Sequence, residues 1–331
     1  MDRVGRLLVV GGGGARGAWS GGFVKRLRYT EHKQPYRYAF GTSTGSPMAP
    51  LIVLDKFGPL ETAYTSVNQG DIFSVNPFTA AGKLKGLNAA WRFLLHKNSF
   101  GDSTKLLTMI KKYFTAEDFR QMNDRGSGIE FTVACIDFTT GGVVYQSSAQ
   151  AGLTYEDMCN WIWASSNEPL FMTFVPIGKD NYVDGGVRAN VPVVRALKAA
   201  KAYGIQDIDV IVSKPVDPII NKSFKPDGIL NNLLRVIELW ETEVRNSNIE
   251  IAELLAKLGE VDLPSPGLAA GESQAINLHF YYIPRALFEA CPNDLIFNEA
   301  QMKQFWADGE NGQQDRPPRQ LTILHKHIDL L

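Results

Sequence analysis

The sequence predicts an α/β protein built on a central, largely parallel sheet. Short apolar segments of the kind that form buried strands alternate with longer segments of helical pattern along the 331 residues. This alternation is typical of helices packed on a parallel sheet. Glycine-rich segments at 11–17 and 41–45 each separate a strand from a helix. The hydrophobic content of 44% is enough for one large core or two smaller ones.

The first strands and helices follow one another closely. Residues 6–10 (RLLVV) predict a buried strand, and a helix is expected from about Ala18 to Tyr29. A second strand covers 36–40, and the helix after it continues through about Asp55. Each of these strands therefore leads through a glycine-rich turn into a helix.

More strands are expected further along the chain. Residues 129–138 (IEFTVACIDF) and 142–147 (GVVYQS) predict a hairpin. Residues 207–213 and 276–283 predict two more strands, since both are short apolar runs. The segment 308–319 (DGENGQQDRPPR) predicts a loop, because it combines glycine and proline with polar residues.

Apolar residues between 228 and 258 recur at helical spacing, and we expect a break at the polar run Asn246-Ser247-Asn248. The pattern predicts a helix with one buried face that packs on the core, and a partner-binding helix is the alternative. The apolar positions are Leu230, Leu233, Leu234, Ile237, Trp240, Val244, Ile251, Leu254, Leu255 and Leu258.

Charge and cysteine content exclude several classes of function. The net charge of −1 provides no basic field to bind a nucleic acid. Cys135, Cys159 and Cys291 are far apart and odd in number, which predicts neither a metal site nor a disulfide framework and suits a reducing compartment. The apolar run from Leu7 to Val10 is too short for a signal peptide, and no stretch approaches the ~20 apolar residues of a membrane span. We therefore expect a cytoplasmic protein.

The stretch AFGTSTGSP, residues 39–47, contains the first candidate for catalysis. The spacing Gly41-x-Ser43-x-Gly45 fits a sharp turn from a strand into a helix, in which the serine hydroxyl is exposed at the edge of the sheet. A turn of small residues without catalytic function is the alternative. The spacing thus makes Ser43 a candidate nucleophile.

The stretch GGGGARG, residues 11–17, can direct several backbone N–H groups at a negative charge near a helix N-terminus. Gly12-x-Gly14-x-x-Gly17 fits a dinucleotide fingerprint, which also requires an acidic residue at the end of the second strand. That strand ends in Phe40 and offers no carboxylate. The second interpretation is an oxyanion hole for an acyl intermediate.

The two glycine-rich turns are expected to lie together. Parallel strands end at the same edge of a sheet, where binding sites collect, so the loop at 11–17 and Ser43 predict one acyl-transfer site. A dinucleotide- or phosphate-binding module in which Ser43 is incidental remains open as the alternative.

A serine nucleophile also needs a base. In α/β-hydrolases the base is a histidine late in the chain, and a triad with a C-terminal histidine remains an open alternative. No histidine lies in a turn rich in glycine or aspartate, whereas Asp184 ends a short strand and is followed by the tight turn of Gly185 and Gly186. The histidines are His32, His96, His279, His325 and His327.

These motifs resemble those of the patatin-like phospholipases over residues 5–215. GGGGARG, GTSTG and DGG match the family's three ordered motifs, and WASSNEPLFMTFVP and ANVPV resemble the segments around the aspartate. The resemblance implies a patatin-like three-layer α/β/α fold and a single catalytic domain over 1–331, with 216–331 as a helical and strand extension packed on it. Asn167 departs from the pattern, since a small residue is usual there, and we expect an effect on the pocket wall.

The resemblance also implies roles for particular residues. Ser43 would be the nucleophile and Asp184 the base of a dyad without histidine, acting on fatty-acyl esters, most often phospholipids, at a lipid or membrane surface. Neither a metal nor another cofactor is implied. The backbone of Gly12, Gly13 and Gly14 would form the oxyanion hole, supported by Arg16, Gly17, Gly41, Gly45, Gly185 and Gly186.

Residues 75–100 mix Phe, Trp and Leu with Lys83, Lys85, Arg92 and Lys97. This mixture suits an interfacial lid over an acyl cleft. An ordinary helical insertion explains the mixture equally well, so both interpretations stay open. Peripheral association with membranes is expected separately, from the lipid substrates that the resemblance implies.

Overall fold

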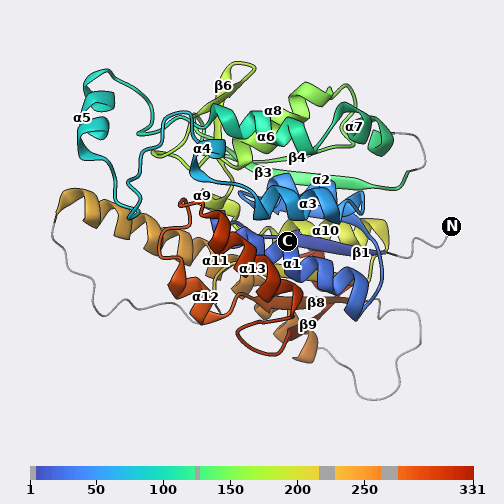
Figure 1. The fold of residues 1–331 in the computed structure, drawn as a ribbon. Helices are drawn as coiled ribbons and strands as arrows, with labels where there is room; N and C mark the ends of the chain where they lie inside the picture. Colours follow the sequence, from blue (N-terminus) through green and yellow to red (C-terminus); the bar gives the residue numbers. More distant parts are fainter. Residues whose placement is uncertain (1–4, 124–126, 216–227, 262–274) are drawn as a thin grey trace, which may run out of the picture.

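The computed structural model describes residues 5–123, 127–215, 228–261 and 275–331. Its centre is a nine-stranded sheet in the order β5-β6-β3-β2-β1-β7-β8-β9, with β4 also paired to β3 (Figure 1). The strands are β1 (Arg6–Val10), β2 (Tyr36–Thr42), β3 (Glu130–Asp137), β4 (Val143–Ser147), β5 (Val175–Ile177), β6 (Asp180–Asp184), β7 (Asp207–Val212), β8 (Ala275–Tyr282) and β9 (Arg319–Leu324).

The middle of the sheet is parallel. Strands β3, β2, β1, β7 and β8 run parallel to one another, whereas β4, β5, β6 and β9 pair antiparallel. The strands expected from the apolar runs and the hairpin of β3 and β4 are confirmed. Strands β8 and β9, which follow residue 215, extend the same sheet as the motif-bearing strands.

Helices cover both faces of the sheet, which confirms the three-layer α/β/α fold. Alternate residues of β1 belong to two separate cores, Leu8 and Val10 to one and Leu7 and Val9 to the other, as the two-residue period of a strand requires. The first core includes side chains of α1 (Gly17–Arg26), α2 (Gly45–Val53), α3 (Phe57–Thr65), α6 (Thr104–Tyr113), α7 (Ala116–Asn123), α8 (Tyr155–Ser165) and α13 (Glu299–Glu310). The second includes those of α10 (Val193–Tyr203), α11 (Ile229–Val261) and α14 (His325–Ile328).

Six further helical elements complete the described part of the chain. They are η1 (Gly14–Arg16), η2 (Leu27–Glu31), α4 (Gln69–Ile72), α5 (Gly86–Leu94), α9 (Gly186–Ala189) and α12 (Arg285–Ala290).

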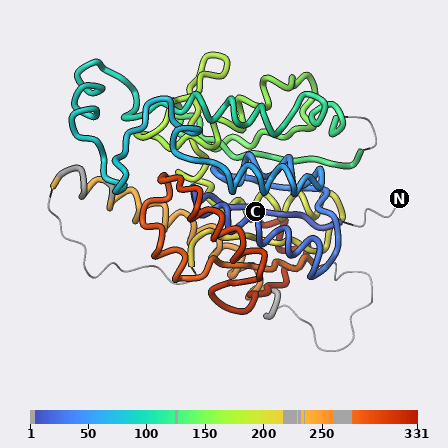
Figure 2. The backbone as a smooth tube through the Cα atoms, viewed as in Figure 1, coloured from blue at the N-terminus to red at the C-terminus, as the bar shows by residue number. Residues whose placement is uncertain are grey.

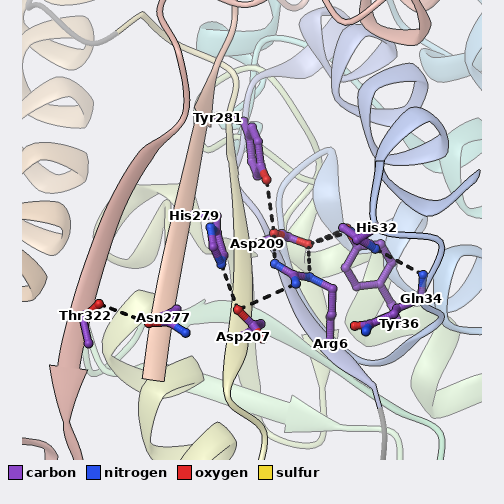
Figure 3. A network of polar contacts seen from close by, with 10 residues as sticks. All are labelled: Arg6, His32, Gln34, Tyr36, Asp207, Asp209, Asn277, His279, Tyr281 and Thr322. Carbon is purple, nitrogen blue, oxygen red and sulfur yellow. Dashed lines mark hydrogen bonds and ion pairs between the residues drawn. The ribbon is translucent and has the colours of Figure 1, made fainter. Parts of the chain in front are cut away.

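A buried polar network joins the amino ends of the parallel strands (Figure 3). Asp209 of β7 is completely buried and accepts two hydrogen bonds of 2.8 Å from the Arg6 guanidinium and one of 2.7 Å from the Tyr36 hydroxyl. The Nε2 atom of His32 lies 3.0 Å from the same carboxylate. Since Arg6, Tyr36 and Asp209 begin or lie near the start of β1, β2 and β7, the network fastens three strands at the edge opposite to Ser43.

Two expectations about the C-terminal region are wrong. Helix α11 continues through Asn246, Ser247 and Asn248 without a break, and the Asn248 side chain donates to the Val244 carbonyl oxygen at 2.6 Å. This bond within the helix lets a polar residue remain there. The segment 308–319 is not all loop, because α13 includes Asp308–Glu310 and β9 begins at Arg319.

The expected buried face of α11 is present only in part. Near its C-terminal end Leu255 is buried with Ala252 and Ala256. Five of the expected apolar positions are exposed instead, namely Leu233, Trp240, Ile251, Leu254 and Leu258. The side chains of Leu230 and Leu234 lie outside the described residues. Sequence periodicity located the helix but not the extent of its contact with the core.

Candidate active site

Ser43 lies in the sharp turn between β2 and α2. Its φ of 55° is in the left-handed region, which non-glycine residues rarely adopt, and such strain clusters at functional positions. The turn packs closely, since a Cβ on Gly45 would come within 2.3 Å of the Val10 carbonyl oxygen. Gly41 lies in β2 and Gly45 begins α2. The expected strand-to-helix turn is therefore confirmed.

The glycine loop joins β1 to α1 and passes directly beside Ser43. A Cβ on Gly12 would lie 2.9 Å from the Ser43 Cβ, so a side chain there would collide with the serine. Gly13 precedes η1, Gly14 begins it with a φ of 51°, and Gly17 begins α1. N–H groups at the start of a helix have no partner within that helix, which leaves those of Gly13 and Gly14 as candidate donors to an oxyanion. The Gly12 N–H, also expected in the oxyanion hole, donates instead to the Asn190 carbonyl oxygen at 3.4 Å.

Arg16 ties the glycine loop to the C-terminal part of the chain. Its guanidinium is buried, forms an ion pair of 3.0 Å with Asp294, and lies 4.3 Å from the centre of the Phe288 ring. The Asp294 carbonyl oxygen also accepts a hydrogen bond of 2.7 Å from the Ala15 N–H. Sequence reasoning missed Asp294, because no motif links it to a loop at the other end of the chain.

Asp184 reaches Ser43 through the register of β3. On β3, Ala134 lies opposite Thr42, the residue before the serine, and Cys135 lies opposite Asp184. The side chain of Asp184 is buried, and its Oδ1 accepts a hydrogen bond of 2.6 Å from the Gly186 N–H. Gly186 begins α9, and Gly185 immediately precedes that helix. The two residues that the sequence singles out are thus brought to one place.

The pKa of Asp184 is raised to about 7. Burial is the main cause, while the hydroxyl of Ser43 and the Gly186 N–H, as hydrogen-bond donors, lower the pKa, and the carboxylates of Glu241 and Asp294 raise it further. Asp184 Oδ2 is buried and has no hydrogen-bond partner among the described residues. This oxygen is therefore available to accept a proton. A carboxyl group with a pKa near neutrality is suited to general-base catalysis.

Ser43, Asp184 and the glycine loop line one cavity, which measures about 1150 Å³ with its open mouth. Most of the wall is apolar and comes from α2, α3, α6, α8 and the segment between α12 and α13. A pocket of this kind, mostly apolar with a few convergent polar groups, is typical of a ligand site. The apolar wall includes Leu51, Tyr64, Leu106, Ile110, Ile162 and Phe297.

Ionisable side chains that sequence reasoning missed also line this cavity. They include Glu168, Lys214 and Glu241, and the Lys214 Nζ lies 3.2 Å from the Glu241 carboxylate. The pKa of Glu168 is raised well above its usual value by burial and by the neighbouring carboxylates of Glu241 and Asp184. Glu241 belongs to α11, so a helix that the sequence predicted only as packing contributes to the site.

None of the five histidines lines the cavity. His279 lies in β8, where its Nε2 atom is 2.9 Å from the Asp207 carboxylate at the start of β7 (Figure 3). His325 and His327 lie in α14. Among the described residues, Asp184 is a titratable neighbour of Ser43 with a pKa near neutrality.

Other expected features are placed differently. No residue of 75–100 lines the cavity, so this segment does not cover it. Asn167 does not line it either, but its carbonyl oxygen accepts a hydrogen bond of 2.9 Å from the Asp184 N–H. Within the described ranges, no group of three or more His, Cys, Asp or Glu side chains is arranged to hold a metal ion. None of the described helices is both long and apolar enough to span a bilayer.

A comparison with protein families identifies the family of the chain. The model of the family described as patatin-like phospholipase matches residues 8–197, more than half of the chain. The chain therefore belongs to the patatin-like phospholipase family, and its membership supports lipid acyl hydrolysis as the activity in general.

Comparison with individual proteins gives more distant similarities. The crystal structure of VipD from Legionella pneumophila is similar with a TM-score of 0.43 and 12% sequence identity, covering 97% of this chain and 68% of that one. None of the curated proteins compared with the chain matches it.

Proposed function

We propose that this chain is a serine hydrolase that cleaves fatty-acyl esters of phospholipids or related lipids through a dyad of Ser43 and Asp184. The observation that supports it most is the shared cavity: a strained serine, a buried carboxyl with a pKa of about 7 and a glycine loop line one mostly apolar space.

The first half of the reaction transfers the acyl group to the enzyme. Asp184 takes the proton from Ser43 Oγ as this oxygen attacks the ester carbonyl carbon. The carbonyl oxygen becomes an oxyanion, which accepts hydrogen bonds from the glycine loop, each donor contributing roughly 10²–10³ in rate. Collapse of the intermediate breaks the ester bond, and the leaving alcohol takes the proton from Asp184.

The second half releases the fatty acid. Asp184 takes a proton from a water molecule, whose oxygen attacks the acyl-serine carbonyl. A second oxyanion forms in the same place, and its collapse returns the proton to Ser43 Oγ. The enzyme is restored, and the products are an alcohol and a fatty acid.

The cavity wall suggests how the substrate lies. An acyl chain fits the apolar part of the wall around Leu106, Ile110 and Phe297, and the alcohol part of the ester faces the charged side chains of Lys214 and Glu241. An acyl chain contributes about 0.8 kcal/mol for each buried CH₂ group, so chain length is expected to affect binding strongly.

Hydrolysis of soluble p-nitrophenyl acyl esters tests the proposal. Ser43→Ala should abolish turnover while thermal unfolding stays cooperative. Ser66 is an exposed serine that does not line the cavity, so Ser66→Ala is the control and should keep the wild-type activity. Turnover by Ser43→Ala at the wild-type rate would refute the assignment of the nucleophile.

A further inference from the structure

We propose that the segment 79–98, which contains α5 and is named here the α5 projection, is the surface by which the protein docks on an anionic lipid bilayer. The inference deepens the proposed function and depends on it for its biological purpose, since a lipid hydrolase must reach its substrate at a bilayer. It concerns residues outside the catalytic cavity.

The α5 projection extends outward from the rest of the fold. Figures 1 and 2 show the chain running out to α5 at the margin of the molecule and returning, clear of the helices that flank the sheet. No residue of α5 is buried. Arg92 nevertheless connects α5 to the segment that follows it, because its guanidinium donates to the carbonyl oxygens of Ser99 at 2.7 Å and Gly101 at 2.9 Å.

Large apolar side chains of α5 are left in water. Leu87 is 89% exposed, Trp91 is 65% exposed and Phe93 is 76% exposed. Leu87, Trp91 and Leu94 recur at the spacing of one helical face, and Leu95 extends this stripe beyond the end of α5. A contiguous exposed stripe of this kind is characteristic of a surface that is covered by a partner, and a tryptophan among leucines is typical of helices that lie in a membrane interface.

The charge around the stripe identifies the partner as an anionic surface. Residues 72–101 contain no aspartate or glutamate, and Lys83, Lys85 and Lys97 are exposed. None of these three lysines forms an ion pair with a described residue. Lysine side chains of this kind extend their ammonium groups to anionic headgroups while their apolar stems lie against the interface.

The place of the projection in the chain connects it with catalysis. Ile72 and Leu106, which precede and follow this excursion, both line the cavity. A bilayer bound by the α5 stripe would therefore contact a segment that continues on both sides into the wall of the acyl site. This arrangement suits transfer of a lipid from the bilayer to Ser43 without α5 itself covering the cavity.

Co-sedimentation with vesicles tests the inference, using the Ser43→Ala chain so that hydrolysis cannot alter the lipid. Vesicles of phosphatidylcholine with phosphatidylglycerol should bind the protein, more weakly as salt is added, and should bind it better than pure phosphatidylcholine. Leu87→Glu/Trp91→Glu should lower the partition coefficient at least about tenfold. Lys83→Gln/Lys97→Gln should lower it about 30-fold on the anionic vesicles and much less on the neutral ones.

Controls separate docking from folding and from catalysis. Leu330 is also a highly exposed leucine, and Leu330→Glu should bind vesicles like the parent chain. In the otherwise wild-type chain, the α5 variants should unfold at the usual temperature and hydrolyse soluble esters normally while losing activity on vesicles.

Vesicle binding that is equal in the parent and both α5 variants would overturn the inference. So would a dimer that Leu87→Glu/Trp91→Glu dissociates in the absence of any vesicle binding, because the stripe would then contact a second copy of the chain. Normal vesicle binding by a wild-type chain that hydrolyses no ester would instead refute the proposed function alone.

Discussion

Asp184 and Asp209 are both buried aspartates beside the same sheet, but their surroundings shift their pKa values in opposite directions. Burial raises the pKa of both carboxyl groups. At Asp209 the hydrogen bonds of His32 and Arg6 outweigh burial and lower the pKa to about 2, whereas at Asp184 burial prevails and the pKa is about 7.

The difference follows from the partners of each carboxylate. Asp209 accepts hydrogen bonds from Arg6 and Tyr36 and lies beside His32, so its negative charge is compensated on several sides. Asp184 accepts a hydrogen bond from the Gly186 N–H, has the hydroxyl of Ser43 near it, and faces the carboxylates of Glu241 and Asp294. A compensated charge stabilises the fold, while an uncompensated one remains available to accept a proton.

The largest expected effect comes from Asp184→Asn. The amide cannot accept the serine proton, so ester hydrolysis should fall by about 10²–10⁴, the usual contribution of a general base. Stability should not fall, because the folded protein no longer contains a buried carboxyl group that must ionise. Steady-state kinetics and thermal unfolding of the same preparation measure both effects.

The difference in stability between Asp184→Asn and the wild type should also change with pH in a definite direction. The pKa of Asp184 is higher in the folded protein than its ordinary 3.8, so the folded state binds the proton more tightly. Wild-type stability from this group therefore decreases as the pH rises from about 4 to about 7. The advantage of Asp184→Asn over wild type should grow over the same range, and an advantage that shrinks would contradict the assignment.

Asp209→Asn should have the opposite result. It removes the carboxylate that accepts two hydrogen bonds from the buried Arg6 guanidinium and leaves Arg6 only the more distant Asp207 carboxylate at 3.7 Å. This should cost up to about 3–5 kcal/mol, while the activity of the folded fraction should change little. The pKa of Asp209 is lowered, so its stabilisation is present above about pH 4 and is lost as the pH falls toward about 2. Denaturant unfolding across this range measures the effect, and wild-type stability in the variant would show that the network is dispensable.

Tyr36→Phe offers a milder form of the same test. It removes one hydrogen bond of 2.7 Å to Asp209 and should destabilise the protein by about 1–3 kcal/mol. This variant keeps the prediction measurable if Asp209→Asn does not fold.

The pH dependence of hydrolysis gives a smaller effect that concerns the cavity carboxylates. Only ionised Asp184 acts as a base, so kcat/KM should rise about tenfold per pH unit below a midpoint of about 7 and level off above it. Glu241→Gln removes a negative charge that raises the pKa of Asp184 and should move the midpoint to lower pH. Glu243 is exposed on the same helix, and Glu243→Gln should leave the midpoint unchanged.

The histidines should have the smallest effect. His279→Gln, His325→Gln and His327→Gln should each keep most of the esterase activity, because none of these side chains lines the cavity. An inactive histidine variant that folds normally, together with an active Asp184→Asn, would indicate a triad in place of the dyad.

Much of the fold was predictable because the central strands are short apolar runs, such as those at 6–10 and 207–213, and glycine-rich turns mark where helices begin. Gly309 shows where local reading failed. The Asp308-Gly309 pair suggests a turn, but a Cβ on Gly309 would lie 2.3 Å from the Trp19 carbonyl oxygen, so this glycine permits close packing of α13 on α1. A contact between distant segments determines the residue, and no local pattern records it.

The candidate site likewise contains residues that were predictable from local motifs and residues that were not. Ser43, Asp184 and the glycine loop lie in local motifs, because each needs a particular turn. Asp294 and Glu241 reach the cavity only through the packing of the C-terminal segment and of α11. No turn or other local structure requires an acidic residue at either position, so these two residues could not be assigned to the site from a single sequence.

Labelling with an alkyl fluorophosphonate, followed by mass mapping of the modified peptide, tests the dyad most directly. The account predicts one adduct, on Ser43, forming at a rate that rises with pH through about 7. Ser43→Ala should give no adduct and Asp184→Asn a strongly slowed one, while Asp209→Asn, where folded, should label at the wild-type rate. An adduct on another serine, or wild-type labelling of Asp184→Asn, would contradict it.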